Sequence, residues 1–333
     1  MILIDSLRPP TLLDQSAAGY KDWLHLNVFD HASGKVGLIN VSLHGAPNDL
    51  RSRAAGAGLV YVPGVGWFGN IEIRGISDVV IHRSGIALEC VALAVQTDAG
   101  KVRASVRDAE SAVTVNVTST AVAPVVSGEE KLPLSEGWIS WYAIPRLTLT
   151  GAWNIGGEYG DLGTASAYHD HNWGRWHWGD DLGWEWGCFL TPGSSGAAFV
   201  LSRTCDRAHR VFGNNSLVVQ LEGRRRTFAG SAVSLNYSGT LPIARRIPGA
   251  LAALHQDHAQ IKLPGSLQIN ANDGMDHVTL EFSAQSAIQL ILGDPLIRGY
   301  SFIHEIAGDF VCAGRLSGAV FKSSGLGILE LVY

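Results

Sequence analysis

Cysteine, methionine and charge are all scarce in this chain. It has four cysteines and two methionines, and charged residues make up 17% of its 333 positions. The cysteines are widely spaced and form no CxxC pair, so they predict no zinc or haem motif, and buried free thiols are expected. Few charges together with 46% hydrophobic residues favour large apolar cores or an apolar cavity, and argue against disorder.

Several common functional signatures are also missing. The net charge is −5 and no basic stripe occurs, which argues against nucleic acid as a partner. No G-x-S-x-G element and no nucleotide-binding fingerprint is present. The first ten residues, MILIDSLRPP, do not have the pattern of a signal peptide. The longest uncharged run, 111–128, alternates valine with threonine, serine and asparagine, which is typical of a strand rather than of a membrane span. We therefore expect a cytoplasmic protein.

Along most of the chain, apolar and polar residues alternate with a period of two. Residues 23–29 and 36–43 alternate around a Ser-Gly-Lys turn, and similar short runs recur at roughly ten-residue spacing, separated by Gly, Asp and Ser. Such a pattern predicts an all-β protein of antiparallel barrels or sandwiches. Charged residues and proline interrupt the predicted strands near 125–150. The halves on either side are similar in length and in their pattern of short strands. We predict two β-domains in tandem, 1–140 and 141–333.

One segment concentrates unusual chemistry. Residues 168–187 read YHDHNWGRWHWGDDLGWEWG and contain five tryptophans, three histidines and four acidic residues. Eight of the ten tryptophans of the chain lie between positions 138 and 186. A core recruits aromatic residues from the whole chain, whereas here they are gathered among acids and imidazoles. We interpret the segment as the wall of a pocket rather than as ordinary core.

Strand alternation divides this segment into faces. If 168–173 is a strand, Tyr168 and Asp170 share one face, and His169 and His171 share the other. A glycine turn at 179–183 predicts a hairpin, with the next strand returning beside the first. On that strand Trp184 and Trp186 share a face and Glu185 lies opposite, so the hairpin is expected to present an acid between indole rings.

A metal site on His169 and His171 is the competing hypothesis, since His-x-His on a strand places two imidazoles side by side. A cupin site would add a Glu three or four residues later, where this chain has Arg175 and Trp176. His177 would complete a three-histidine site only in one particular hairpin register. Histidines that bond to the backbone and hold the segment in place are the better explanation, so we expect no metal here.

The run 168–174, Tyr-His-Asp-His-Asn-Trp-Gly, followed by Trp-Glu-Trp at 184–186, resembles the lipocalin-like carotenoid 1,2-hydratase (hydroxyneurosporene synthase) and AttH-like superfamily. The resemblance implies two lipocalin-like β-domains with a largely apolar pocket near their junction. Members of the group include carotenoid hydratases, cofactor-free cyclases and Diels–Alderases. In the hydratases a Tyr and an Asp of this motif act with an upstream His-x-Trp pair. Tyr168, Asp170 and Trp141 match these positions, but Ile139 replaces the histidine, which argues against the same carotenoid reaction.

We therefore expect a cofactor-free hydratase or cyclase that acts on an apolar isoprenoid or polyketide. Asp170 is the expected general acid and Tyr168 its hydrogen-bond partner, because burial among indoles keeps a carboxyl group protonated. The residues expected to contact the substrate are Trp141, Trp173, Trp184, Trp186 and Glu185.

Two alternatives remain: a pericyclase that folds its substrate without acid catalysis, and a lipid or isoprenoid carrier. Asp170 would then be structural, paired with Arg175 or Arg203. A monomer or a homodimer fits equally well.

Overall fold

The computed structural model describes residues 6–8, 19–96, 101–128, 130–248, 261–293 and 299–333. The chain divides into two compact units. The first comprises Met1–Val62 and Phe68–His177, and the second comprises Pro63–Trp67 and Trp178–Tyr333. Each unit is built on one sheet, so the prediction of two all-β domains in tandem is confirmed.

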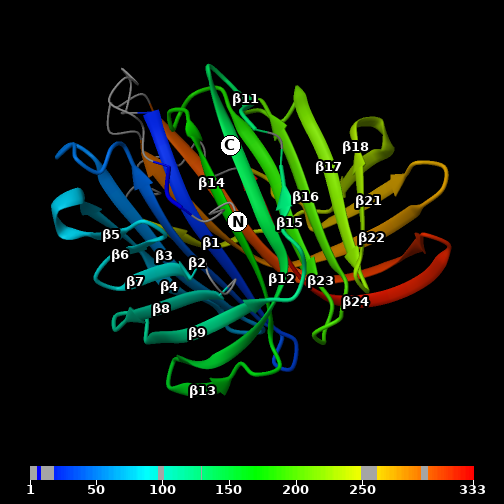
Figure 1. Ribbon diagram of the computed structural model, residues 1–333, viewed down its shortest axis with the longest axis horizontal. Coiled ribbons are helices and arrows are strands. Elements are labelled where there is room, and N and C mark those ends of the chain that lie inside the picture. The colour runs from blue at the N-terminus through cyan, green and yellow to red at the C-terminus, as the bar shows by residue number, and fades with distance from the viewer. Residues whose placement is uncertain (1–5, 9–18, 97–100, 129, 249–260, 294–298) are drawn as a thin grey trace. The chain divides into compact units, whose positions relative to one another are not determined.

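The first unit contains a 14-stranded sheet in the order β4-β3-β2-β1-β14-β12-β9-β8-β7-β6-β5, with β10, β11 and β13 paired to β12 (Figure 1). The pairings within β1–β2–β3, those of β12 and β14 with their neighbours, and those from β5 to β9 are antiparallel, and a 3-10 turn at Ile76–Asp78 links β4 to β5. The strands are β1 (Tyr20–Asp30), β2 (Lys35–His44), β3 (Arg53–Val62), β4 (Gly66–Gly75), β5 (Val80–His82), β6 (Gly85–Ala87), β7 (Val91–Gln96), β8 (Lys101–Asp108), β9 (Val113–Ala121), β10 (Val126–Ser127), β11 (Leu132–Leu134), β12 (Gly137–Ile155), β13 (Glu158–Asp161) and β14 (Ser166–Arg175).

The second unit contains a 10-stranded sheet in the order β18-β17-β16-β15-β24-β23-β22-β21-β19, with β20 added in parallel to β22. A 3-10 turn at Gly230–Ala232 precedes β19. The strands are β15 (Gly183–Leu190), β16 (Ala198–Cys205), β17 (Phe212–Leu221), β18 (Arg224–Ala229), β19 (Val233–Ser238), β20 (Ile243–Ile247), β21 (Ser266–Asn272), β22 (His277–Gly293), β23 (Tyr300–Leu316) and β24 (Ala319–Val332).

Alternation places the apolar side chains of strands such as β8 and β9 on one face of the sheet. The valines of β9 are buried while the residues between them are largely exposed, as the period-two pattern of 111–128 predicts. The core of the first unit is closely filled, and the space around Trp153 and Gly37 amounts to about 10 Å³. Such a space is too small for a ligand.

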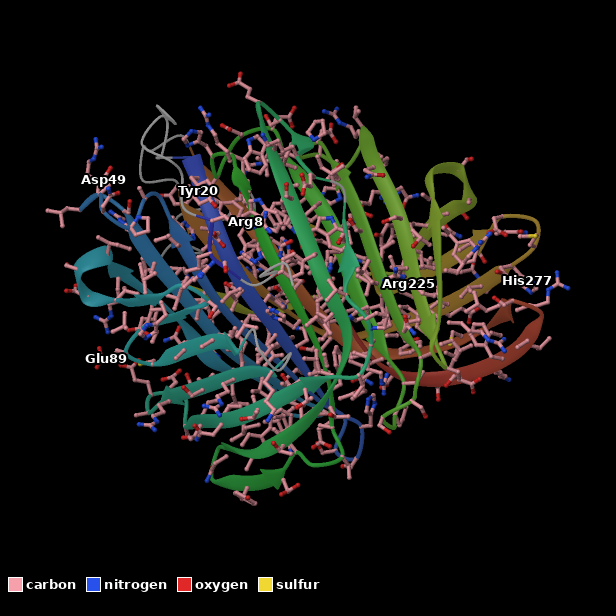
Figure 2. All side chains as sticks on the ribbon, viewed as in Figure 1. Arg8, Tyr20, Asp49, Glu89, Arg225 and His277 are labelled. Atoms are coloured by element: carbon pink, nitrogen blue, oxygen red, sulfur yellow. The ribbon has the colours of Figure 1, made fainter. Side chains whose placement is uncertain are left out.

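The core of the second unit is built on phenylalanines. Phe189 packs edge-on against Phe282 and Phe310, with ring centroids 5.3 and 5.8 Å apart, and Phe199 packs against Phe310 in the same way. Edge-to-face rings of this kind add about 0.5–1.5 kcal/mol per pair to the burial of their surface. Outside the cores, polar residues such as Glu89, Arg225 and His277 are exposed (Figure 2).

The division between the units falls at His177 and Trp178, whereas the sequence analysis places the boundary at 140/141. The 37 residues 141–177 lie in the first unit because β12 pairs with β9 and β14 pairs with β1. The charged, proline-containing stretch that suggests a boundary forms β10, β11 and their loops at the edge of β12. Among the described residues no helix has the length and hydrophobicity that crossing a bilayer requires.

Candidate functional site

The motif strand β14 lies in the middle of the first sheet, between β1 and β12. Tyr168 and Asp170 share one face and His169 and His171 the other, as the alternation predicts. Tyr168 and Asp170 are both buried, with 0% and 4% of their surface exposed. The pair therefore lies together on one face of a central strand.

Asp170 lies in a row of polar side chains. Across the sheet its neighbour on β1 is His25, and the neighbour of Tyr168 is Asn27. Asp170 Oδ1 accepts a hydrogen bond from Asn172 Nδ2 at 2.5 Å. A buried carboxyl group is thus held by an amide and adjoins an imidazole.

His25 is a neutral imidazole. One ring nitrogen donates to Asn27 Oδ1 at 3.0 Å, and the other accepts from Asn40 Nδ2 at 3.3 Å. Burial lowers the pKa of His25 to about 4, the hydrogen bond to Asn27 opposes that change, and nearby His169 adds to it. The imidazole that the family motif would supply at position 139 is thus present beside Asp170, but it comes from β1.

Indole rings continue this face. Trp23 and Trp141 lie on either side of Asn172, on β1 and β12, and Asn172 is two residues along β14 from Asp170. Trp23 also packs edge-on against Trp176, with centroids 5.2 Å apart. Trp141 was expected to line the site and lies on the same face as Asp170, whereas Trp23 was not among the expected site residues.

The opposite face of β14 holds the His-x-His pair. His169 Nδ1 donates to the carbonyl oxygen of His25 at 2.7 Å. His171 Nε2 lies 2.6 Å from Asp22 Oδ1, and its Nδ1 lies 2.9 Å from the Tyr142 hydroxyl. A backbone carbonyl, a carboxylate and a phenol thus hold the two imidazoles in place.

Trp173 lies on the histidine face and not with Asp170. Its ring is 5.9 Å from that of Tyr142, and the Arg8 guanidinium lies 4.0 Å from its centroid. Arg8 and Tyr20, labelled in Figure 2, both donate to Asp22 Oδ2, Arg8 through its backbone N–H. Trp173 is therefore part of a small aromatic cluster with these residues, and not part of the face that presents Asp170.

The hairpin expected between 168–173 and 184–186 does not form. β14 pairs with β1 and β12 in the first sheet, while β15 pairs with β16 and β24 in the second. The prediction is wrong because the intervening turn leads from one sheet into the other instead of reversing the chain. Within β15 the faces are as predicted: Trp184 and Trp186 share one face and Glu185 lies on the other.

An acid pair that the sequence analysis missed lies on the tryptophan face of β15. Glu330 of β24 is the neighbour of Trp186 on one side and of Glu305 of β23 on the other. Trp184 Nε1 donates to Glu330 Oε1, and a hydrogen bond joins Glu330 to Glu305. Glu305 is buried and Glu330 is half-buried, and two carboxyl groups in contact disfavour each other's ionised form. The missed signal was an acid standing alone in apolar strands, in ILELV and FIHEIA.

Burial raises the pKa of Glu330 above its ordinary value, although the hydrogen bonds with Glu305 and Trp184 act in the opposite direction. A raised pKa is the direction that a general acid requires. A carboxyl group beside indole rings therefore also occurs in the second unit.

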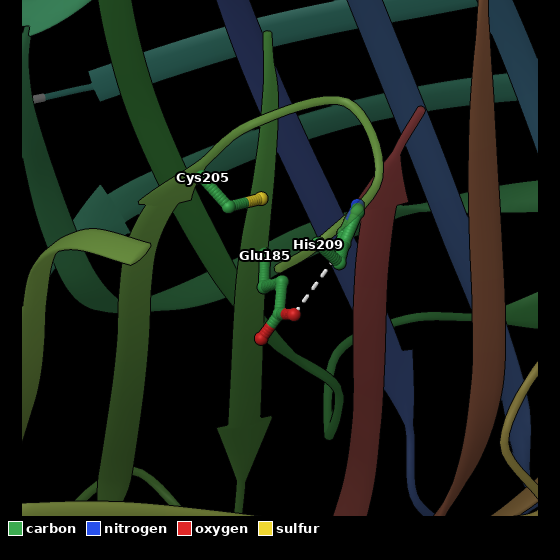
Figure 3. Close-up of side chains that lie close together, drawn as sticks. All are labelled: Glu185, Cys205 and His209. Carbon is green, nitrogen blue, oxygen red and sulfur yellow. Dashed lines mark hydrogen bonds and ion pairs between the residues drawn. The ribbon is translucent and has the colours of Figure 1, made fainter. Parts of the chain in front are cut away.

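Glu185 has the opposite character. It accepts from the Arg203 guanidinium, from Tyr237 Oη at 2.6 Å and from His209 Nδ1 at 2.9 Å (Figure 3). Burial acts to raise its pKa, but the hydrogen bonds of His209 and Tyr237 and the charge of Arg203 outweigh it, so the pKa is lowered. Glu185 is an ionised carboxylate on the core face of β15, so it does not share a face with Trp184 and Trp186.

A surface groove of about 480 Å³ lies elsewhere on the first unit. It is formed by short side chains of β6 to β9, with His82, Arg103 and Asn116 on its walls. None of the expected site residues lines it, so it is not part of the candidate site.

No family model and no curated protein matches the sequence. Solved structures do match over almost the whole chain. The AttH-like protein NE1406 from Nitrosomonas europaea has a TM-score of 0.67 at 15% identity, covering 97% of both chains. Kievitone hydratase from Nectria haematococca has a TM-score of 0.63 at 12% identity, covering 99% of this chain and 94% of its own. CghA in complex with Sch210972 has a TM-score of 0.59 at 10% identity, covering 95% and 88%. This chain therefore shares the fold of these three proteins.

Proposed function

We propose that this protein is a cofactor-independent hydratase or cyclase that protonates an apolar polyene, either an isoprenoid or a polyketide. The observation that carries the proposal is that buried Asp170 and half-buried Glu330 each lie beside indole rings. Asp170 shares its face with Trp141, and Glu330 bonds to Trp184. The fold shared with kievitone hydratase is consistent with such chemistry.

In the first unit, Asp170 is the proposed proton donor. Its proton and the two π electrons of an alkene form a new C–H bond, which leaves a carbocation on the adjacent carbon and a carboxylate on Asp170. Indole faces stabilise such a cation by up to about 2 kcal/mol when water is excluded. Water or a hydroxyl of the substrate then captures the cation and its O–H proton returns to Asp170. If an alkene of the substrate captures it, a ring bond forms and a new cation results, which loses a proton from an adjacent carbon to Asp170. Tyr168, on the same face, positions the carboxyl group or the attacking water.

The Glu305–Glu330 pair is the alternative donor. In this alternative Glu330, whose pKa is raised by burial, is the proton donor, Glu305 is its hydrogen-bonded neighbour, and Trp184 and Trp186 supply the indoles. The reaction is the same as for Asp170, but the proton originates in the second unit. Substitution of Asp170 and substitution of Glu330 therefore distinguish the two proposed donors.

Deuterium incorporation tests the acid step directly. The protein is incubated in D₂O with a panel of linear isoprenoids and polyketide polyenes, and the products are examined by mass spectrometry and NMR. Protonation of an alkene places one deuterium on carbon in each product molecule. A product without deuterium on carbon contradicts the acid mechanism and favours a pericyclase, and tight binding without any product favours a carrier.

Two isosteric substitutions then assign the donor. Asp170→Asn is expected to lower kcat by about 10²- to 10⁴-fold, the usual contribution of general acid catalysis, while ligand binding is retained. Glu330→Gln is expected to lower kcat by less than that. A larger loss of kcat in Glu330→Gln than in Asp170→Asn would assign the proton to the glutamate pair. Full activity in both variants would rule out both donors.

A further inference from the structure

Three side chains of different chemistry converge in the second unit. Glu185 comes from β15, Cys205 ends β16, and His209 lies in the turn that follows. A carboxylate oxygen, the thiol sulfur and an imidazole nitrogen all lie within 4.8 Å of one another (Figure 3). All three side chains are largely buried on the core side of β15.

The Glu185 carboxylate is held by one oxygen. Arg203 and Tyr237 both donate to Oε2, and Oε1 faces His209. Arg203 and Tyr237 thus bind one carboxylate oxygen, and the other oxygen is directed at the imidazole of His209. Metal-binding carboxylates are typically oriented by such outer partners.

His209 is held in the same manner. Its Nε2 donates to the Val332 carbonyl oxygen at 2.8 Å, and its ring stacks on Tyr333 with centroids 4.1 Å apart. The backbone of His209 has φ +53°, in the left-handed region that non-glycine residues rarely occupy. These contacts direct Nδ1 towards Glu185, and a histidine that donates its other N–H to a carbonyl is the usual metal ligand.

Cys205 has room only because its neighbour on β15 is a glycine. A Cβ atom at Gly183 would lie 3.1 Å from the Cys205 sulfur. The thiol does not form a nucleophile with His209, because both ring nitrogens are engaged by Glu185 and Val332. Burial, followed by the charge of Glu185, also raises the pKa of the Cys205 thiol.

We propose that Glu185 Oε1, Cys205 Sγ and His209 Nδ1 bind one divalent ion of the zinc type. Nitrogen, sulfur and oxygen donors together suit Zn²⁺, and three protein ligands leave one position for water. The ion displaces the proton of His209 Nδ1 and the proton of the Cys205 thiol to solvent, so that an imidazole nitrogen and a thiolate become ligands. The charges of the carboxylate and the thiolate then balance that of the ion, and Arg203 remains on Oε2. The ion would fasten the turn after β16 to β15. It lies on the face opposite Trp184, so the inference does not depend on the acid chemistry proposed above.

Cobalt titration of the full chain, freed of metal with a chelator, tests the site. Wild-type protein is expected to bind one Co²⁺ per chain, with a thiolate-to-cobalt absorption band in the near ultraviolet that Zn²⁺ abolishes by displacement. Cys205→Ser should lose the band. The matched control Cys312→Ser, at another buried free cysteine, should keep it. No saturable band in wild type, or loss of the band in the control alone, overturns the proposal.

A residue that does not touch the ion distinguishes a built site from chance binding by a thiol. Tyr237→Phe removes only the outer hydrogen bond to Oε2. It is expected to weaken Zn²⁺ affinity by about 10- to 100-fold, as loss of an outer partner generally does. Unchanged affinity in this variant, with the band intact, would mean that the carboxylate is not a ligand and would refute the three-ligand site.

Discussion

Acidification should destabilise the protein through His25. The folded chain holds this imidazole neutral, with one nitrogen donating to Asn27 and the other accepting from Asn40. Its pKa is lowered from 6.5 to about 4. Between these two values the unfolded chain binds a proton at His25 that the folded chain does not bind. The free energy of unfolding therefore falls as the pH is lowered from 6.5 to 4, and this contribution stops changing below 4.

The size of the effect follows from the shift. A difference of 2.5 pKa units, from 6.5 to about 4, corresponds to about 3 kcal/mol at 1.36 kcal/mol per unit. A sizeable fraction of the stability of a typical domain would be lost in this way. The pKa of His304, in the second unit, is also lowered to about 4, by burial above all, and adds a loss of the same sign.

Urea unfolding between pH 7 and pH 4 measures this loss. A His25→Gln variant cannot take up the proton, so the difference in stability between wild type and variant should change by about 3 kcal/mol across the window. Exposed His277 supplies the control, because His277→Gln should leave the pH dependence as it is in wild type. Equal pH dependence in wild type and His25→Gln would refute the neutral, buried imidazole. Comparing variants cancels the contributions of other histidines.

Further predictions concern the second unit. Arg203→Met should destabilise it by about 3–5 kcal/mol in chemical denaturation, because the buried Glu185 carboxylate loses its guanidinium partner; a loss below about 1 kcal/mol would contradict that reasoning. Gly327→Ala should lower stability by about 1–3 kcal/mol, because the added Cβ would lie 2.4 Å from the Phe189 ring. The control Gly75→Ala, where only side-chain oxygens lie within 4 Å, should have little effect, and equal losses would refute the packing argument.

The sequence predicted the β architecture well because alternation is a local property. The run 111–128 forms strands from the valine pattern alone, and Tyr168 and Asp170 share a face. The domain boundary at 140/141 was less accurate. Proline and charge in that region mark the edge strands beside β12, and a local composition change does not distinguish an edge strand from a linker.

The candidate site was predicted in part. Asp170 and Trp141 lie on one face as expected site residues, whereas Trp173, also expected to contact the substrate, lies on the face of His169 and His171, as strand alternation by itself predicts. The Glu305–Glu330 pair escaped notice because its members lie 25 positions apart, on different strands.

What the sequence determined by itself is the alternation within each strand: which residues of 168–173 and 184–186 share a face. A side chain's face depends only on the two-residue repeat of the backbone. Only the tertiary structure decided that these two strands belong to different sheets, that His25 adjoins Asp170, and that Glu330 meets both Glu305 and Trp184. Those neighbours come from pairings between distant segments, and the free energy of such pairings depends on how the whole sheet packs, which a local pattern does not contain.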